Sequence, residues 1–536
     1  MNMNGELLLI ARSGSSPLVT SEIAGSKAAQ LWRMAQLGLP VPPAFVLPTN
    51  LCAAVNAGGR DARAVVQHYL DKGVAWLEEI TGRRFGDSRA PLLVSVRSGA
   101  AASMPGMLET ILDVGLNDET VRGLIRMSGN PRLAFDSFRR FIQGYAEVVA
   151  HVPGVGFEKR LGEMMRREGV TNETQLDPEA LERLTSEFRE FALRASGHAI
   201  PNDPREQLNC AAIAVYRSWE SGRAKEYRRL NQLEGLKGTA VTVQAMVFGN
   251  SGGKSGAGVA FSRNPATGSK ELYVDFLFDA QGEDVVSGRR TPGHAERLAA
   301  RLPEVAKELA GGIKHIEAEI RDAQDVEFTV EDGRLYFLQT RSAKRTPLAA
   351  LRIAVDMVHE GLIDVDSALE RLGKLDAENL SIARFAEPAP SIATAISAAP
   401  GVANGRVAFD SLHAKELAAA GVPVILVRPE TSTEDVEGFA VAVGILTAVG
   451  GRTAHAAVVA RQLGKVCLVG CRALVIDEKN HTAILGGANI REGDWLSLDG
   501  DRGEISLGQR AIVTEEPPEL AEIARWRPSA AVRARG

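Results

Sequence analysis

Cysteine, aromatic residues and net charge are all scarce in this chain. Four cysteines occur among 536 residues, and Cys467 and Cys471 lie in or just after an apolar stretch without further histidine or cysteine neighbours in range. This spacing argues against a zinc site there and favours a reducing cytoplasm. The formal net charge of −5 gives no electrostatic reason to bind nucleic acid or an acidic membrane surface.

Long hydrophobic runs are also missing. No apolar stretch approaches the length of a membrane-spanning helix, and the short apolar run near the N-terminus has no basic residues before it, so we expect neither a membrane span nor a signal peptide. A hydrophobic content of 45% and a charged content of 24% are typical of soluble globular proteins. The length exceeds what one hydrophobic core supports, so we expect about two to four domains.

The most informative stretch runs from residue 444 to residue 470. A short strand with β-branched residues leads to a Gly-Gly turn at 450–451, and His455 follows at the start of a helix, with Thr453 as a candidate N-cap. The glycines let another molecule come close, and the free N–H groups of a helix start favour an anion. A neutral imidazole is nucleophilic near pH 7, so His455 is a candidate phosphoryl acceptor. On spacing alone, a surface histidine is the commoner explanation.

A second candidate site lies in a hairpin predicted within residues 324–341. Asp325 and Glu327 are separated by one residue on the first strand, so their carboxylates share one face. Such a pair suits a Mg²⁺ ion that bridges nucleotide phosphates. Without further context, alternating charge on a half-exposed strand is the commoner reason for this pattern.

The turn of this hairpin decides what joins the carboxylates. A three-residue turn at 331–333 would pair Asp325 with Gln339 and bring Gln339 and Arg341 to the same face. A two-residue Asp-Gly turn would place Gln339 on the other side. We predict the three-residue turn, with Gly333 in the left-handed conformation.

Two basic residues in the first hundred positions are weaker candidates for phosphate binding. Arg97 ends a predicted strand and precedes a loop of small residues that includes Ser103. Lys27 lies at the start of a predicted helix. From the residues alone, a surface-capping arginine and a solvated lysine explain them as well.

Several strings resemble one known family. GGRTAHAAVVAR, which contains His455, is similar to the phosphohistidine motif of the pyruvate phosphate dikinase family, whose swivelling histidine takes phosphate from ATP. LLVSVRSGA, SMPGM, AVTVQAMVFGN, SGAGVAFSRNPATG, AQGEDVV and QDVEFTVEDGRLYFLQTR resemble its nucleotide-binding half, which has an ATP-grasp fold. The SMPGM version is closer to the inorganic-phosphate-using dikinase than to phosphoenolpyruvate synthase.

The resemblance implies roles for individual residues, a cofactor and a substrate. His455 would be the catalytic carrier, Mg²⁺ the cofactor and ATP the substrate. The metal would be held by Asp325 and Glu327. The nucleotide and its phosphates would be bound by Lys27, Arg97, Gln244, Glu283, Glu327, Gln339 and Arg341.

The same resemblance implies an α/β and α+β multidomain fold. We expect an ATP-grasp nucleotide-binding domain at 1–345, within which 116–235 is a mostly helical insertion. A helical linker at 346–389 would lead to a swivelling β/α phosphohistidine domain at 390–510, followed by a tail at 511–536. A Pro/Ala/Ser-rich stretch marks the boundary before the β/α domain.

Some positions depart from the family pattern. Val449 stands where an arginine is usual, Arg452 where methionine is common, and Ala454 where serine or cysteine is found. Ser26 replaces the middle glycine of a Gly-Gly-Lys. Thr453 matches the regulatory threonine of the family, although we favour a capping role. The loss of an arginine beside the carrier removes charge stabilisation that Arg452 could restore.

The expected function is ATP- and phosphate-dependent phosphorylation of His455. The family's C-terminal barrel, which binds pyruvate or phosphoenolpyruvate, would begin where this sequence stops, so we expect the acceptor domain to be supplied by a separate protein or to be absent. Inorganic phosphate would be the second partner, and the chain would be cytoplasmic. The alternatives are a nucleotide-binding regulatory protein that has lost phosphotransfer, and a kinase of another small acceptor.

Overall fold

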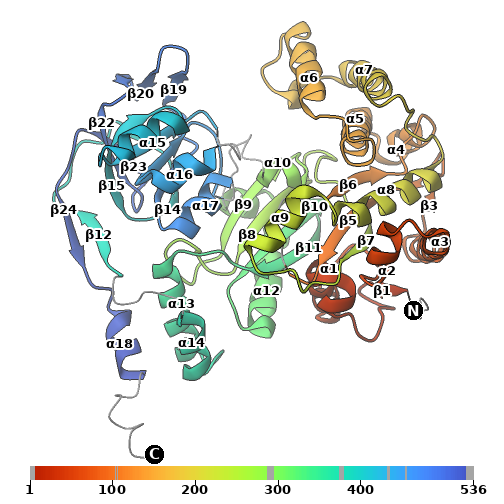
Figure 1. The fold of residues 1–536 in the computed structure, drawn as a ribbon, viewed down its shortest axis with the longest axis horizontal. Coiled ribbons are helices and arrows are strands. Elements are labelled where there is room, and N and C mark those ends of the chain that lie inside the picture. The colour runs from red at the N-terminus through yellow and green to blue at the C-terminus, as the bar shows by residue number, and fades with distance from the viewer. Residues whose placement is uncertain are drawn as a thin grey trace, which may run out of the picture. The chain divides into compact units, whose positions relative to one another are not determined.

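The chain folds into two compact units (Figure 1). The computed structural model describes residues 7–102, 104, 107–286, 295–373, 380–430, 435–452 and 455–526. The N-terminal unit comprises Met1–Gly253 and Tyr336–Thr340, and the C-terminal unit comprises Lys254–Leu335 and Arg341–Gly536. This division reflects packing alone, so the domain limits given above stay a prediction. The mixed α/β architecture with several sheets confirms the expected fold class.

The N-terminal unit is built on a five-stranded sheet with the order β1-β2-β7-β5-β6. All neighbouring strands in it are antiparallel. The strands are β1 (Leu8–Ile10), β2 (Ala44–Leu47), β5 (Val94–Ala100), β6 (Thr110–Val114) and β7 (Thr239–Ala245). Two short parallel strands, β3 (Arg84–Phe85) and β4 (Pro91–Leu92), precede β5 in the chain. β7 is buried at every position, as expected for a central strand covered on both faces.

Helices dominate the stretch between β6 and β7. They are α4 (Thr120–Ser128), α5 (Pro131–Val149), α6 (Val155–Arg167), the short 3₁₀ helix η1 (Glu173–Gln175), α7 (Pro178–Ser196), α8 (Pro204–Ser218) and α9 (Gly222–Leu230). Three of them begin at an Asn or Asp cap followed by proline, as at Asn130 and Asp177. The cap accepts a backbone N–H and the proline has none to lose, so both residues favour a helix start.

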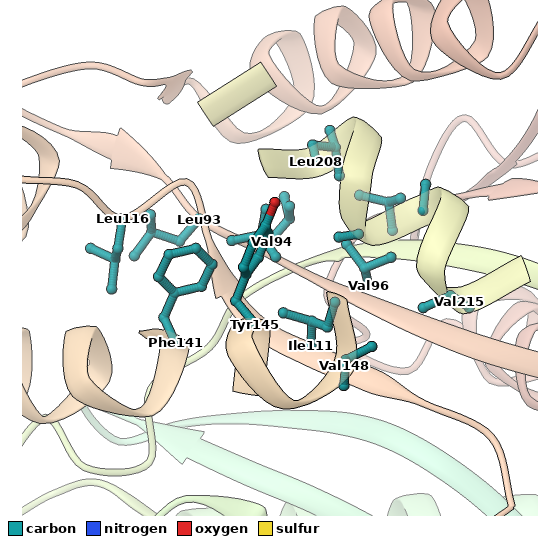
Figure 2. Close-up of a cluster of buried hydrophobic side chains, with 14 of the residues drawn as sticks. Leu93, Val94, Val96, Ile111, Leu116, Phe141, Tyr145, Val148, Leu208 and Val215 are labelled. Atoms are coloured by element: carbon teal, nitrogen blue, oxygen red, sulfur yellow. The ribbon is translucent and has the colours of Figure 1, made fainter. Parts of the chain in front are cut away.

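The core of this unit lies where α5 and α8 meet the sheet (Figure 2). Phe141 and Tyr145 of α5 are four residues apart and so project from the same side of the helix. They pack with β5 residues such as Val94 and Val96, and with Leu208 of α8. All five side chains are less than 4% exposed. Apolar spacing of three and four in the sequence therefore produces the helix faces that cover the sheet.

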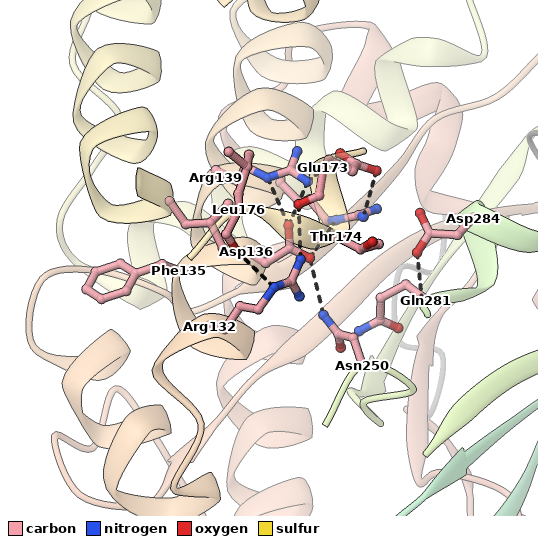
Figure 3. A network of polar contacts seen from close by, with 12 residues as sticks. Arg132, Phe135, Asp136, Arg139, Glu173, Thr174, Leu176, Asn250, Gln281 and Asp284 are labelled. Carbon is pink, nitrogen blue, oxygen red and sulfur yellow. Dashed lines mark hydrogen bonds and ion pairs between the residues drawn. The ribbon is translucent and has the colours of Figure 1, made fainter. Parts of the chain in front are cut away.

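A buried charge network ties α5 to η1 (Figure 3). Arg139 contacts Asp136 at 2.6 Å and Glu173 at 2.7 Å, and Arg140 approaches the second oxygen of Asp136 at 3.1 Å. Burial alone would raise the pKa of Asp136, but the two arginines outweigh it and hold that pKa well below its usual range. Asn250 donates a further hydrogen bond to Asp136 at 3.4 Å. The network fixes the start of α5 against a loop with few apolar residues of its own.

Helix α1 (Ser21–Gln36) is broken at Gly25, which lies against β5. Gly25 has φ +80°, and a Cβ built on it would lie 2.2 Å from the carbonyl oxygen of Gly99. We therefore expect Gly25→Ala to destabilise the protein by about 3 kcal/mol, because backbone strain and a backbone clash add together. Gly144→Ala on α5 is the matched control: no atom lies within 4 Å of its Cβ, so a gain of about 0.5–1 kcal/mol is expected.

Denaturant unfolding of the two variants checks this prediction. Equal stability of Gly25→Ala and the parent chain would show that α1 can shift away from β5.

The remaining helices of the unit, α2 (Leu51–Asn56) and α3 (Arg60–Thr81), pack near β2 and complete the same core.

A four-stranded sheet of order β11-β10-β8-β9 contains strands β8, β9 and β10 of the C-terminal unit. Its strands are β8 (Gly256–Phe261), β9 (Tyr273–Phe278), β10 (Gln324–Glu331) and β11 (Arg334–Ser342). Between β9 and β10 lie α10 (Gly282–Val286), α11 (Ala295–Arg301) and α12 (Pro303–Ile320). Phe276 and Phe328 stack at 5.7 Å on one face of the sheet. Two helices follow in the chain, α13 (Pro347–His359) and α14 (Val365–Leu372).

A second, eight-stranded sheet forms the β/α domain of this unit, with the order β13-β23-β22-β15-β16-β17-β18-β14. Strands β15 (Val402–Ala408), β16 (Val424–Arg428), β17 (Gly444–Thr447) and β18 (Val466–Val469) are parallel. Strands β16 to β18 are almost wholly buried, as parallel strands between covering layers usually are. The antiparallel strands are β13 (Ala393–Thr394), β14 (Ile396–Ala399), β22 (Trp495–Asp499) and β23 (Glu504–Leu507).

Three helices and a small sheet complete this domain. The helices are α15 (Ser411–Ala419), α16 (Val436–Val441) and α17 (His455–Leu463). The small sheet is formed by β19 (Leu474–Asp477), β20 (Thr482–Leu485) and β21 (Ala488–Arg491). Outside the domain, β12 (Ile382–Phe385) pairs with β24 (Ile512–Glu515), and α18 (Glu519–Trp526) follows. No helix among the described residues is both long and apolar enough to cross a bilayer.

Candidate active site

The carboxylates predicted to hold a metal do share one face of β10. Asp325 is the register partner of Phe261 on β8, and Glu327 is the partner of Val259. Arg341 joins them: its Nε lies 2.8 Å from Asp325 Oδ2 and its Nη2 lies 3.4 Å from Glu327 Oε1. The Asp325 side chain is 8% exposed and that of Arg341 is 42% exposed. One buried and one accessible carboxylate thus share a single guanidinium.

The prediction about the hairpin turn is wrong. β10 ends at Glu331 and β11 begins at Arg334, which leaves a two-residue turn of Asp332 and Gly333. Both turn residues have positive φ, 48° and 77°, as a type I′ turn requires. An Asp-Gly pair is favoured in such turns because aspartate tolerates the left-handed conformation. The preference of Asp332 and Gly333 for the left-handed conformation therefore favours the shorter turn.

A two-residue turn no longer predicts that Asp325 pairs with Gln339. Arg341 nevertheless contacts both carboxylates. Buried positions along β11 change phase, from Leu335 and Phe337 to Thr340, so strict alternation from the turn does not hold. Gln339 is half-buried in β11. Its place on the carboxylate face stays a prediction.

Asp325 carries the clearest sign of an unmet ligand requirement. Its Oδ1 is buried and has no hydrogen-bond partner among the described residues. Burial raises the pKa of Asp325, and Arg341 offsets this effect only in part. An orphaned carboxylate oxygen beside the half-exposed Glu327 fits the oxygen ligands that Mg²⁺ prefers. These residues therefore fit a magnesium ion.

A substitution at Asp325 should separate stability from metal binding. A carboxyl whose pKa is raised on folding destabilises the native state at neutral pH, and this cost disappears as the pH falls below the ordinary carboxyl pKa. We expect Asp325→Asn to raise the melting temperature in the absence of metal by roughly 2–4 °C, equivalent to about 1 kcal/mol, while abolishing stabilisation by Mg²⁺ and ATP. Calorimetry with and without Mg²⁺–ATP measures both effects. A lower melting temperature without metal would contradict the interpretation.

Helix α17 begins at His455, as predicted, and ends before Gly464, which has φ +65°. The side chain of His455 lies outside the described residues, as do Thr453 and Ala454. Thr453 was predicted as a cap or regulatory site, and that prediction is untested. Val449 is described: its backbone oxygen accepts a hydrogen bond of 2.7 Å from Thr447, which fixes the end of the loop.

Arg461 is a residue of this helix that sequence reasoning passed over. It is 1% exposed, and its Nη1 donates to the carbonyl oxygens of Ala398 at 3.1 Å and Arg452 at 2.8 Å. Its Nε and Nη2 have no hydrogen-bond partner within the part of the chain that the structure describes. Burial lowers the pKa of Arg461, against the opposing charges of groups such as Tyr273 and Asp325. A single charge in an otherwise apolar helix was the signal in the sequence.

Arg452 also has a defined place in the C-terminal unit. Its guanidinium lies over the ring of Tyr273, 4.3 Å from the ring centroid, and Tyr273 donates to the carbonyl oxygen of Ser397 at 3.3 Å. Burial raises the pKa of the Tyr273 hydroxyl, so this residue remains a neutral donor. The arginine that replaces the family's methionine is thus engaged in a cation–π contact.

The predicted residues of the N-terminal unit gather on its sheet. Arg97 on β5 is the register partner of Thr242 on β7, and Ser95 is the partner of Gln244, so Arg97 and Gln244 share a face. Arg97 Nε donates to Ser95 Oγ at 3.2 Å. Gln244 is 2% exposed and donates to the backbone of Pro42 at 3.3 Å. These hydrogen bonds therefore hold the side chains of Arg97 and Gln244 in place on the sheet.

Two further candidates are exposed. Lys27 lies on α1, two residues after the break at Gly25, and Glu283 lies on α10 of the C-terminal unit. Of the loop resembling the family's SMPGM string, Ser103, Pro105 and Gly106 lie outside the described residues. Lys27 and Glu283 belong to different units, and all of these nucleotide-binding assignments stay predictions.

The structure defines a multidomain α/β protein whose β/α domain carries a helix that begins at His455. Comparisons with known proteins agree. Residues 62–303 match the family model described as "Pyruvate phosphate dikinase, AMP/ATP-binding domain", and residues 421–503 match "PEP-utilising enzyme, mobile domain". The chain is therefore similar to the ATP-binding and mobile domains of the pyruvate phosphate dikinase family.

Individual relatives show how much of the family the chain spans. It is 45% identical over 504 residues to pyruvate, phosphate dikinase 2 of Zea mays, which covers 93% of this chain and 57% of the relative. It is 46% identical over 499 residues to pyruvate, phosphate dikinase of Clostridium symbiosum, covering 92% and 57%. A chloroplastic dikinase of Arabidopsis thaliana is 44% identical over 509 residues, covering 94% and 53%. The chain therefore spans just over half the length of these relatives.

Proposed function

We propose that this chain catalyses the ATP- and phosphate-dependent phosphorylation of its own His455, the nucleotide half-reaction of a pyruvate phosphate dikinase-like phosphotransferase. The observation that carries the proposal is the buried Oδ1 of Asp325, which has no hydrogen-bond partner among the described residues and lies beside Glu327 and Arg341. Burial of the Asp325 carboxylate lowers the stability of the folded protein. A protein without nucleotide chemistry has no reason to retain such a costly carboxylate. The start of helix α17 at His455 supports that residue as the proposed acceptor.

In the proposed reaction, a neutral ring nitrogen of His455 attacks the β-phosphorus of ATP. The bond from that phosphorus to the oxygen bridging it to the α-phosphorus breaks, and AMP leaves. Inorganic phosphate then attacks the terminal phosphorus, so that pyrophosphate leaves and one phosphoryl group stays on the histidine. A Mg²⁺ ion would neutralise charge on the phosphate oxygens when it is bound.

The chain's own residues would orient the nucleotide and offset the charge that develops on it. Arg341 is held by the two carboxylates and would keep its guanidinium beside the phosphates. Arg97, whose Nε donates to Ser95 Oγ, is also proposed to bind phosphate. The remaining nucleotide contacts are proposed for Lys27, Gln244, Glu283 and Gln339.

The phosphoryl group would pass from His455 to pyruvate, or from phosphoenolpyruvate in reverse, on a separate protein or on a part outside this sequence. The printed names of the relatives include pyruvate and phosphate, which is why these are the proposed partners. No residue of this chain is assigned to binding pyruvate.

A single-turnover assay tests the proposal. The purified chain is mixed with Mg²⁺ and ATP in the absence of any acceptor, with and without inorganic phosphate. We expect about one AMP per protein molecule, and pyrophosphate only when phosphate is added. Formation of ADP in place of AMP would contradict the proposed attack at the β-phosphorus.

A nucleotide-binding regulatory protein is the second candidate. Val449, in place of the family's arginine near the carrier, favours it because a phosphohistidine then lacks one cationic neighbour. Stabilisation by Mg²⁺–ATP without any AMP would support this alternative. A kinase of another small acceptor would instead give AMP and a phosphorylated histidine, but would not transfer to pyruvate.

A further inference from the structure

Two histidines and two carboxylates that are assigned no role above lie together in the β/α domain. Asp410 immediately precedes α15, His481 lies in the turn between β19 and β20, and Glu492 follows β21. One ligand atom from each of these three residues lies within 4.8 Å of the other two. His413, in the first turn of α15, adjoins them. Segments some eighty residues apart in sequence therefore place side chains of the metal-binding types together.

Glu492 stands between the two imidazole rings. Its Oε2 is 3.1 Å from His481 Nδ1, and its Oε1 is 4.0 Å from His413 Nε2. Asp410 Oδ1 accepts the backbone N–H of His413 at 2.8 Å, so Oδ2 is the oxygen available to a ligand. The backbone thus holds Asp410 and His413 in a fixed relation to each other.

No basic side chain satisfies these carboxylates. Among the described residues, the ion pairs of Glu492 are with His481 and His413, and Asp410 has none with lysine or arginine. The nearby Arg428 is committed elsewhere, to Asp435 at 3.2 Å and Glu478 at 3.0 Å. Two carboxylates without lysine or arginine partners, beside two imidazoles, form a donor set that attracts a cation.

The spacing suits a small tetrahedral ion. Ligand atoms at about 2.0–2.2 Å from Zn²⁺ lie roughly 3.3 Å from one another. The separation of 3.1 Å between Glu492 and His481 already meets this requirement, and side-chain rotation closes the remainder. The side chains of His481 and Glu492 are 50% and 22% exposed, so an ion can reach them from solvent.

We propose that Asp410, His413, His481 and Glu492 form a binding site for a divalent transition metal, for which Zn²⁺ is the best fit. His481 coordinates through Nδ1 and His413 through Nε2, and each carboxylate supplies an oxygen. Imidazole nitrogen selects this class of ion over Mg²⁺ and Ca²⁺, which prefer oxygen ligands. The bound ion joins the start of α15 to the β19–β21 sheet and stabilises the β/α domain. The proposal is independent of phosphotransfer.

The test is a calorimetric titration of the untagged, chelator-treated full chain with Zn²⁺ and, separately, with Mg²⁺, in the absence of nucleotide. We expect one equivalent of Zn²⁺ to bind at least about a hundred times more tightly than Mg²⁺, since imidazole ligands discriminate against the harder ion. His481→Ala and Glu492→Gln should each weaken Zn²⁺ binding at least about tenfold, because each loses a ligand. His413→Ala should weaken it as well.

His359→Ala is the matched control. His359 pairs with Glu522 at 2.5 Å on the surface of the same unit, so this variant also breaks a histidine–glutamate pair but leaves the cluster intact. Zn²⁺ binding by this variant should equal that of the parent chain. A loss as large as that of His481→Ala would show non-specific binding and overturn the proposal.

A rescue variant guards against misfolding. His481→Cys keeps a metal ligand, and it should restore Zn²⁺ binding and the rise in melting temperature that Zn²⁺ causes. Zn²⁺ at about a hundred times its dissociation constant should multiply the folded-to-unfolded ratio by about a hundred. Failure of the parent chain to bind Zn²⁺, or unchanged binding by both His481→Ala and Glu492→Gln, would overturn the proposal.

Discussion

Replacement of His455 by alanine should abolish AMP formation from ATP. Because the nucleophile itself is removed, we expect the single-turnover rate to fall by at least about a thousandfold. Binding of Mg²⁺–ATP should remain, because the proposed metal ligands Asp325 and Glu327 lie on β10 and not on α17. Rapid quench for AMP and calorimetry for ATP binding measure the two quantities on the same preparation.

His315→Ala is the control for this experiment. His315 is an exposed histidine of α12 that is assigned no role, and its loss should leave AMP formation unchanged. Turnover of His455→Ala at the parent rate would show that the histidine at the start of α17 is not the phosphoryl carrier.

The second large effect concerns stability and a buried arginine. Arg263 is wholly buried after β8, with Nε 3.0 Å from Glu317 on α12 and Nη2 2.9 Å from Glu360 after α13. Burial alone would lower the pKa of Arg263, but the two glutamates outweigh it and the net direction is upward. Arg263→Met would leave Glu317 buried without its partner, at a cost of about 3–5 kcal/mol. The melting temperature of the C-terminal unit should fall by about 10 °C or more.

A surface pair provides the comparison. Arg189 contacts Asp118 at 2.8 Å, but its side chain is 44% exposed. Arg189→Met should therefore change stability by less than about 1 kcal/mol. Thermal unfolding of both variants, followed by calorimetry, checks the contrast. Equal melting temperatures would show that the glutamates around Arg263 find other partners or become protonated.

Local patterns predicted most of the secondary structure because each pattern has one dominant physical cause. The alternation of Asp325 and Glu327 placed both carboxylates on one face, and β10 has them there. The apolar run before the Gly-Gly turn became β17, and the helix after it begins at His455. In these cases strand and helix periodicity coincide with burial, so local sequence and tertiary structure agree.

The failures have physical causes too. The Asp332-Gly333 turn is one residue shorter than predicted because both residues adopt the left-handed conformation that a two-residue type I′ turn requires. Arg461, Arg263 and the Asp410 cluster depend on contacts between segments that are far apart in sequence. A lone charge in an apolar helix marks Arg461 in the sequence, but only the folded structure shows which distant segments these residues contact.

The proposed half-reaction is tested most directly by comparing ATP labelled at the β-phosphate with ATP labelled at the γ-phosphate. Each is incubated with the chain, Mg²⁺ and inorganic phosphate, and the protein is then analysed for acid-labile, base-stable label. We predict that the β-label is found on His455 and the γ-label in pyrophosphate. Bound ATP with no label on the protein would contradict the account and favour the regulatory alternative.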